Sequence, residues 1–123
     1  VKINTMAKAE KKSLTAPDET RTFPNGKFEV VNFEGWTIGK ATFEPGWKWS
    51  ESVKPIAKTD SCQAAHAAYV LSGRLHIVMD DGTNIEIGPG DTANVPPGHD
   101  AWVVGSESCI MLDFSAAKTY AAK

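Results

Sequence analysis

Residues 90–104 read GDTANVPPGHDAWVV, and this stretch decides the fold. It begins with the turn-forming pair Gly90-Asp91, continues through a short apolar run and stops at the corner Pro96-Pro97-Gly98. Proline has no backbone N–H and glycine readily adopts positive φ, so both residue types end strands and form turns. His99 follows the corner directly and begins a second apolar run. The stretch therefore predicts two strands joined by a tight corner, with a histidine at the start of the second strand.

The same glycine and proline punctuation extends in both directions along the chain. Asn25-Gly26 precedes an apolar run, Pro45-Gly46 ends an alternating run, and Asp81-Gly82 is a strong signal for a two-residue hairpin turn. Roughly eight short strands separated by such turns predict an antiparallel all-β sandwich or barrel. We expect one domain over residues 21–115, a flexible polar tail over residues 1–20 and a short C-terminal tail over residues 116–123. Within the first tail, we expect Met6 to be the natural start and residues 1–5 to be added ones.

Composition and charge exclude several functional classes. The 123 residues include 13 basic and 15 acidic side chains, for a net charge of -2, which gives no electrostatic basis for nucleic-acid binding. No apolar run approaches the roughly 20 residues that a membrane-spanning helix needs. Cys62 and Cys109 have no CxxC spacing, and no signal-peptide pattern precedes them. We expect a cytoplasmic protein with reduced thiols and a small-molecule ligand, although only geometry decides whether the two cysteines form a disulfide.

The spacing of Gly90, Pro96 and Gly98 resembles the second signature segment of the cupin family, which consists of small β-barrels of jelly-roll type. The segment from Gly46 to Gly73 is similar to the first signature. The resemblance covers residues 22–114. It implies a single-domain antiparallel jelly-roll barrel of the RmlC-like type, whose interior binds a divalent metal in many members.

In the family's metal-binding pattern, the first segment supplies two histidines and a glutamate, and the second supplies one histidine. Counted from the signature glycines, these four positions hold Ser52, Lys54, His66 and Ala101. Only His66 has a ligating side chain in register. His99 lies two residues before the last position, and residues two apart in a strand share a face, so His99 can still point inward.

His66 and His99 are therefore the candidate catalytic and metal-binding residues. The two histidines could bind one divalent ion such as Fe, Mn, Ni or Zn, and Glu51, Asp100 or water could complete its coordination shell. The alternatives are that His66 is a hydrogen-bonded neutral imidazole or a general base, and that the His99 ring bonds a backbone carbonyl at the corner. Cys62 lies four residues before His66, about 13 Å away along an extended strand, so the two side chains could not easily share one ion.

Tryptophans form the other candidate part of the site. Trp47 and Trp49 would share a strand face and Trp102 follows the corner, so the three rings could line a barrel mouth suited to a flat or apolar ligand. The alternative is that they fill the core and a dimer contact. The remaining expected lining residues are Ser52, Lys54, Cys62 and Ala101.

The activity stays open at this level. Three hypotheses remain: a small enzyme such as a metal-dependent oxygenase or isomerase, a non-catalytic metabolite-binding module, and a metal-free scaffold. Tyr69 and Leu71 alternate with Ala68 and Val70, so both faces of this strand are apolar. Such a strand needs cover on its outer face, and we expect a homodimer.

Overall fold

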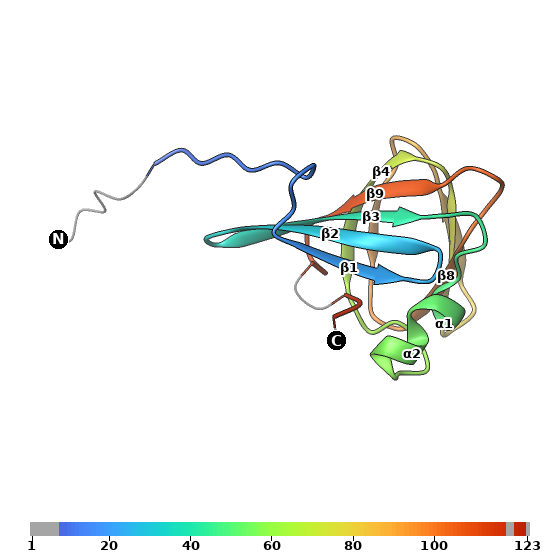
Figure 1. Cartoon of the computed structure of the whole chain (residues 1–123). Coiled ribbons are helices and arrows are strands. Elements are labelled where there is room, and N and C mark those ends of the chain that lie inside the picture. Colours follow the sequence, from blue (N-terminus) through green and yellow to red (C-terminus); the bar gives the residue numbers. More distant parts are fainter. Residues whose placement is uncertain (1–7, 118–119, 123) are drawn as a thin grey trace.

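Two antiparallel β-sheets pack face to face in the computed structural model, which describes residues 8–117 and 120–122 (Figure 1). The strands in this part of the chain are β1 (Glu19–Phe23), β2 (Gly26–Phe33), β3 (Trp36–Phe43), β4 (His66–Ser72), β5 (Leu75–Met79), β6 (Asn84–Ile87), β7 (Thr92–Val95), β8 (His99–Val103) and β9 (Cys109–Asp113). Two short helices, α1 (Trp49–Ser52) and α2 (Lys54–Ala57), lie between β3 and β4. The prediction of an all-β jelly-roll barrel is confirmed.

The strand order shows how distant parts of the chain meet. The larger sheet has the order β1-β2-β3-β9-β4-β7, and the smaller sheet has the order β6-β5-β8. Strand β9, near the end of the chain, pairs with both β3 and β4. In Figure 1 the larger sheet faces the viewer and β8 lies behind it. Residues near the end of the chain are therefore built into the centre of the larger sheet.

The predicted turns are present. Asn25 has a φ of 62° between β1 and β2, Gly82 has a φ of 91° between β5 and β6, and Gly98 has a φ of 96° just before β8. Gly73, after β4, has a φ of 76°, and a Cβ atom at this position would overlap the backbone of Ser108. Only glycine combines positive φ with such close backbone approach at low cost.

Side chains alternate along β4 and β8, and this alternation places both candidate histidines in the interior. His66, at the start of β4, is 9% exposed, and His99, at the start of β8, is 4% exposed. Because β4 belongs to the larger sheet and β8 to the smaller one, the two imidazoles approach from opposite sheets. Their ring centroids lie 5.1 Å apart.

The two helices correct the register that was counted from Gly46. That count used the spacing of the family signature, but here the chain turns into α1 after Lys48, where the backbone N–H of Ser52 donates to the carbonyl of Lys48. Ser52 ends α1 and Lys54 begins α2, so neither occupies a strand position that faces the barrel interior. Burial of the Trp49 ring, which is 2% exposed, holds α1 against the barrel.

The C-terminal residues expected to form a short tail contribute to the core. The buried members are Ala116, Ala117, Tyr120 and Ala121. The Tyr120 ring packs edge-on against Phe28 with centroids 5.1 Å apart, and Arg21 Nη1 donates to the Tyr120 carbonyl oxygen at 2.7 Å. The end of the chain thus closes one side of the barrel.

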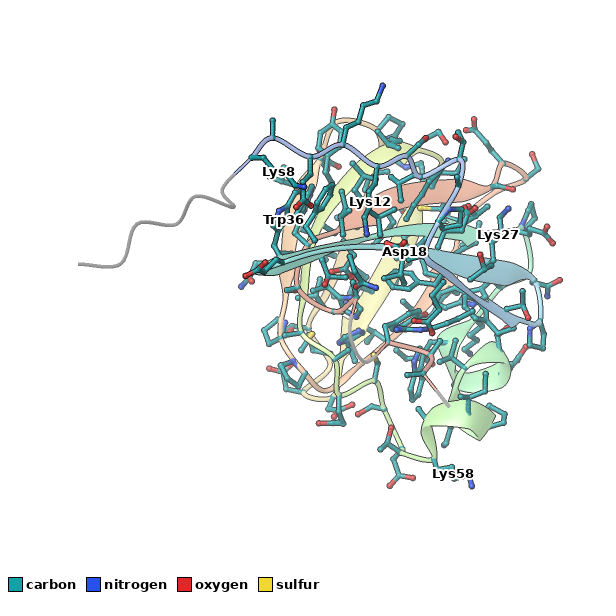
Figure 2. The ribbon with its side chains drawn as sticks, turned by 60° about the vertical axis from the view of Figure 1, so that its left-hand side comes forward. Lys8, Lys12, Asp18, Lys27, Trp36 and Lys58 are labelled. Atoms are coloured by element: carbon teal, nitrogen blue, oxygen red, sulfur yellow. The ribbon has the colours of Figure 1, made fainter. Side chains whose placement is uncertain are left out.

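At the other end of the chain, residues 8–18 precede the first strand and contain no helix or strand. Lys12 Nζ bonds Asp18 at 3.1 Å and the Asn32 carbonyl oxygen at 2.6 Å (Figure 2). Met6 and residues 1–5, for which we made a prediction, lie outside the described residues. No helix in the described ranges is long and apolar enough to cross a membrane.

Candidate functional site

Cys62, His66 and His99 meet inside the barrel. Their ligating atoms all lie within 4.8 Å of one another, and Cys62 Sγ is 3.7 Å from His66 Nε2. Cys62 and His99 are buried, with 3% and 4% of their surfaces exposed. In the described part of the chain this is the only group of three or more such side chains close enough to share a metal ion.

This arrangement overturns the expectation that Cys62 and His66 could not easily share an ion. Strand β4 begins only at His66, so the chain between the two residues is not extended along one sheet. Cys62 instead bridges to His99 of β8, its backbone N–H donating to the His99 carbonyl at 2.7 Å. The chain crosses from one sheet to the other between Cys62 and His66, and the crossing brings the sulfur to the imidazole.

Both imidazole rings are held through Nδ1. His66 Nδ1 lies 2.5 Å from Asp113 Oδ2, and Asp113 is 1% exposed. His99 Nδ1 donates to the Pro96 carbonyl at 2.9 Å, which confirms the predicted contact between the ring and the corner. Each Nδ1 is thereby occupied, and Nε2 remains the nitrogen available to a ligand.

The cluster is strongly polarised. Burial raises the pKa of the Cys62 thiol, but hydrogen bonds with His66 and His99 outweigh burial and bring that pKa down to about 6. Burial lowers the pKa of His66, but its bonds to Asp113 and Cys62 outweigh burial and raise that pKa to about 9. Burial also raises the pKa of Asp113, but the bonds from His66 and from the backbone N–H groups of Ala116 and Ser115 outweigh burial. The net effect is a pKa below the usual value. Both shifts favour the charged forms, a Cys62 thiolate and a protonated His66.

Two cavities adjoin the cluster. The inner one, with a volume of about 30 Å³, is walled by Trp47, Trp49, His66, His99 and Tyr120 and otherwise by mainly apolar side chains. The outer one, of about 400 Å³, lies between the helices and the C-terminal residues and includes Trp49, Cys62 and Tyr120 in its walls. Figure 1 shows the helices and the C-terminal end on the same side of the barrel.

The structure places some of the residues expected to line the pocket in the walls of these two cavities and places others elsewhere. Trp47, Trp49 and Ala101 line the inner cavity, and Cys62 lines the outer one. Trp102 is on the outer face of β8, because it alternates with the inward-facing Ala101, and its ring stacks on His76 at 4.7 Å. It does not line either cavity.

The polar residues expected around the site lie elsewhere. Ser52 is buried and Lys54 is half-buried on the helices, and neither lines the two cavities. Glu51 is exposed. Asp100 Oδ1 accepts the backbone N–H groups of Ser50 and Ala101, so it acts as a structural bridge to α1 and does not complete the cluster.

Sequence reasoning missed Asp113 and Tyr120. Asp113 takes the inward position after Cys109 and Met111 in β9, and a carboxylate in that alternation was a readable signal of a buried partner. Tyr120 carried no comparable signal, since it follows a short helix-forming run beyond the last strand. Its ring lies edge-on to His66 with centroids 5.6 Å apart.

Comparison with known proteins agrees with this architecture. Residues 47–111 match the model of the EutQ-like cupin domain. A structure of unknown function from Rhizobium leguminosarum bv. viciae has a TM-score of 0.64 at 22% identity, covering 89% of this chain and 97% of that one. The polyketide cyclase RemF from Streptomyces resistomycificus has a TM-score of 0.62 at 18% identity, with coverages of 89% and 80%.

An RmlC-like cupin from Shewanella frigidimarina has a TM-score of 0.57 at 22% identity, covering 82% of this chain and 86% of that one. No curated protein sequence matches the chain. At these identities the structural likenesses establish the fold alone, whereas the matched domain spans more than half of the 123 residues. The chain belongs to the cupin family, as a small single-domain member with a EutQ-like cupin domain.

Proposed function

We propose that this cupin binds one transition-metal ion, zinc or iron(II), through Cys62, His66 and His99, and presents the ion to a small ligand in the barrel. One observation carries the proposal: both imidazoles are fixed at Nδ1 by an acceptor, Asp113 Oδ2 or the Pro96 carbonyl. Metal-ligating histidines in proteins almost always donate their second ring N–H to such a carboxylate or carbonyl, because that bond sets the tautomer and the ring orientation.

The donor set suits such an ion. Two ligands on a tetrahedral zinc, at about 2.3 Å for sulfur and about 2.0–2.1 Å for nitrogen, lie about 3.5 Å apart, and Cys62 Sγ lies 3.7 Å from His66 Nε2. A thiolate with two imidazoles favours zinc or iron over manganese, which prefers oxygen ligands. Three protein ligands leave one position open, as in catalytic sites. When bound, such an ion polarises a ligand oxygen or lowers the pKa of bound water.

Residues around the proposed ion would orient its ligands and exclude water from the site. The Asp113 carboxylate holds the His66 ring, and the Pro96 carbonyl holds the His99 ring. Trp47, Trp49 and Tyr120 exclude bulk water, since each is at most 5% exposed. Exclusion of water strengthens every electrostatic interaction at the site.

A second candidate is a metal-free binding module or scaffold, and the small inner cavity favours it. A cavity needs about 10–15 Å³ to hold one water, so a volume of about 30 Å³ offers space for only a very small occupant. If the interior holds no ion, the thiolate and imidazolium would form a structural pair within a filled barrel. The metal content of the protein separates the two candidates.

The experiment is elemental analysis of protein purified without chelators. We expect about one equivalent of zinc or iron per chain, from one three-ligand site, and loss of the metal in His66→Ala. The matched control is His76→Ala, because His76 lies on the outer face of β5 against Trp102 and should leave the metal content unchanged. Folded wild-type protein that takes up neither zinc nor iron(II) would overturn the proposal, and equal metal content in His66→Ala would do the same.

We also propose a cytoplasmic homodimer. Tyr69 and Leu71 are 38% and 46% exposed on the outer face of β4, as the two-sided apolar pattern predicts. Reduced Cys62, which the ion requires as a thiolate, suits a reducing compartment. Sedimentation of wild type and Leu71→Glu checks the assembly: we expect a dimer for the first and a shift toward monomer for the second. A wild-type monomer would contradict this part of the proposal.

A further inference from the structure

Cys62, His66 and Asp113 are connected in series by two contacts. Cys62 Sγ lies 3.7 Å from His66 Nε2, and His66 Nδ1 lies 2.5 Å from Asp113 Oδ2. A nucleophile within reach of a base, with the base oriented by a third group, is the arrangement that activates cysteine or serine for covalent catalysis. The three side chains therefore have the connectivity of a nucleophile, a general base and a carboxylate that positions the base.

The carboxylate that positions the base is itself fixed. Asp113 Oδ1 accepts the backbone N–H groups of Ser115 and Ala116, each at 3.0 Å, which leaves Oδ2 for the imidazole. Because Asp113 is 1% exposed, bulk water does not compete for this contact. With the ring proton on Nδ1, the lone pair of Nε2 faces the sulfur. His66 is thereby held in the tautomer that a base for Cys62 requires.

The sulfur-bearing residue borders the outer cavity, which is large enough for an organic substrate. Its volume of about 400 Å³ falls within the range of small-molecule sites. No charged side chain among the described residues lines this cavity. Its aliphatic walls are formed by Val53, Ile56, Ala57 and Ala64. Such a cavity favours an uncharged substrate with a short aliphatic group.

Two buried hydrogen-bond donors without a partner occur in residues that line both cavities. They are Trp49 Nε1 and the Tyr120 hydroxyl, and the two residues are 2% and 5% exposed. Buried donors are normally paired, so each exception requires an explanation. Attack on a carbonyl carbon places negative charge on the carbonyl oxygen, and preorganised donors stabilise that charge. Trp49 and Tyr120 supply donors of this kind in the walls that they share with Cys62.

We propose that Cys62, in the metal-free protein, is the nucleophile of an ester-hydrolysing site that opens to the outer cavity. His66 is its general base, and Asp113 is the residue that positions the base. The substrate class is an uncharged carboxylic ester with a short aliphatic acyl group. This inference goes beyond the proposed function and does not depend on it. Bound zinc should inhibit the reaction, because a sulfur that holds an ion cannot attack a carbonyl carbon.

The reaction balances in two steps without an oxidant or a reductant. In the first step, the Cys62 sulfur forms a C–S bond to the ester carbonyl carbon and the bond from that carbon to the leaving-group oxygen breaks. His66 Nε2 passes the thiol proton to that oxygen. In the second step, Nε2 takes a proton from water, the water oxygen bonds the carbonyl carbon, and the C–S bond breaks. The thiol regains its proton, and the products are a carboxylic acid and an alcohol.

The test uses full-length protein freed of metal with a chelator and mixed with p-nitrophenyl butyrate. We expect a burst of about one equivalent of p-nitrophenolate per chain, a butyryl adduct on Cys62 in peptide mapping, and continued turnover. One equivalent of zinc should suppress the burst. The acetyl ester should react more slowly, because the longer acyl group buries more apolar surface in the cavity. Equal rates for the two esters would contradict the aliphatic substrate class.

Two variants test the roles of the side chains. Cys62→Ala should lose the adduct and the burst, and His66→Gln should slow adduct formation by at least about 100-fold, the lower end for general acid–base catalysis. Tryptophan fluorescence monitors the folding of both. The matched control is Cys109→Ala, because Cys109 is 0% exposed and lines neither cavity. It should react as wild type does.

The outcomes keep this inference separate from the proposed function. Release of p-nitrophenolate that is no faster in wild type than in Cys62→Ala overturns the inference and leaves the metal site intact. A butyryl adduct on Cys62 that water never removes also overturns it, since the proposed base is then inactive. A burst that persists in zinc-loaded protein overturns the shared use of the sulfur. Acylation and turnover in a protein that takes up neither zinc nor iron(II) support this inference and overturn only the proposed function.

Discussion

Cys62→Ser should lower the affinity for zinc by more than about 100-fold, because it removes a residue that binds the ion directly. Loss of a group that only hydrogen-bonds a metal ligand lowers metal affinity by about 10–100-fold. Cys62 is the only cysteine that lies with the two imidazoles in a candidate ligand group of the described chain, and its Sγ is 3.7 Å from His66 Nε2. A serine hydroxyl is a harder donor that stays protonated at neutral pH. In the cobalt(II) protein, the sulfur-to-metal charge-transfer absorption should disappear with the substitution.

The matched control is Cys109→Ala. Cys109 is fully buried in β9, and burial together with Glu107 raises the pKa of its thiol to about 11. It lines neither cavity and should behave as a small buried apolar side chain. Retained charge-transfer absorption in Cys62→Ser, or its loss in Cys109→Ala, would contradict the assignment of the sulfur ligand.

Thiol labelling gives an independent readout of the same prediction. Cys62 borders the outer cavity of about 400 Å³, so a small alkylating reagent can approach it in metal-free protein. Cys109 should stay unlabelled in the folded chain. Bound zinc should protect Cys62, because a coordinated thiolate is a weaker nucleophile and Tyr120 restricts the approach to it. Equal labelling with and without zinc would argue against coordination.

The barrel could be predicted from sequence because its turns have strict local requirements. Gly98 adopts positive φ immediately before β8, and Gly73 leaves no space for a side chain. Such demands depend on a few neighbouring residues and are therefore readable without the fold. Inward-facing His66 and His99 followed from strand alternation, which is also local.

The composition of the site was less readable, because it depends on where the chain leaves regular structure. Counting from Gly46 misplaced Ser52 and Lys54, because these residues lie in the short helices α1 and α2. The separation of Cys62 from His66 was misjudged for the same reason, since it assumed one extended strand. A count along the sequence measures distance only where the backbone conformation is known.

Contacts between segments that are distant in the sequence could not be predicted for a different reason. Asp113 pairs with a histidine 47 residues earlier, because β9 inserts beside β4 in the larger sheet. Tyr120 reaches the same space from beyond the last strand. Neither position follows from local pattern, since strand order in a jelly roll depends on the packing of the whole chain.

Asp113→Asn should combine a loss of stability with a loss of metal binding. The carboxylate accepts from His66 Nδ1 through one oxygen and from the N–H groups of Ser115 and Ala116 through the other. An asparagine keeps the shape but has only one acceptor oxygen, so its amide NH₂ must face either the His66 N–H or the two backbone N–H groups. A buried donor facing a donor costs about 1–3 kcal/mol.

The geometry decides which contact is lost. If the asparagine oxygen faces the backbone, it accepts from two N–H groups, whereas it accepts from only one if it faces His66. We therefore expect the amide NH₂ of the asparagine to face His66. His66 then accepts at Nδ1 and carries its proton on Nε2, the atom 3.7 Å from Cys62 Sγ. A protonated Nε2 has no lone pair for a metal. We therefore expect zinc affinity to fall by about 100-fold, the upper end for loss of a supporting partner.

Asp113→Ala separates the two roles of the carboxylate. The substitution removes the carboxylate that pairs with His66, and it leaves the His66 Nδ1–H and the backbone N–H groups of Ser115 and Ala116 without an acceptor. Breaking a buried ion pair in this way lowers the free energy of unfolding by about 3–5 kcal/mol. The His66 tautomer is then free to adjust, so metal affinity per folded molecule should fall less than in Asp113→Asn. Urea unfolding and zinc competition with a chelator measure the two quantities.

The control for both variants is Asp81→Asn, since Asp81 is an exposed turn residue that bonds Thr83 and faces no part of the cluster. It should change metal affinity little and stability by less than about 1 kcal/mol. If Asp113→Asn binds zinc as tightly as Asp81→Asn, the tautomer of His66 does not depend on Asp113. In that case the orientation of the His66 imidazole would have to arise from its packing against Tyr120 and His99.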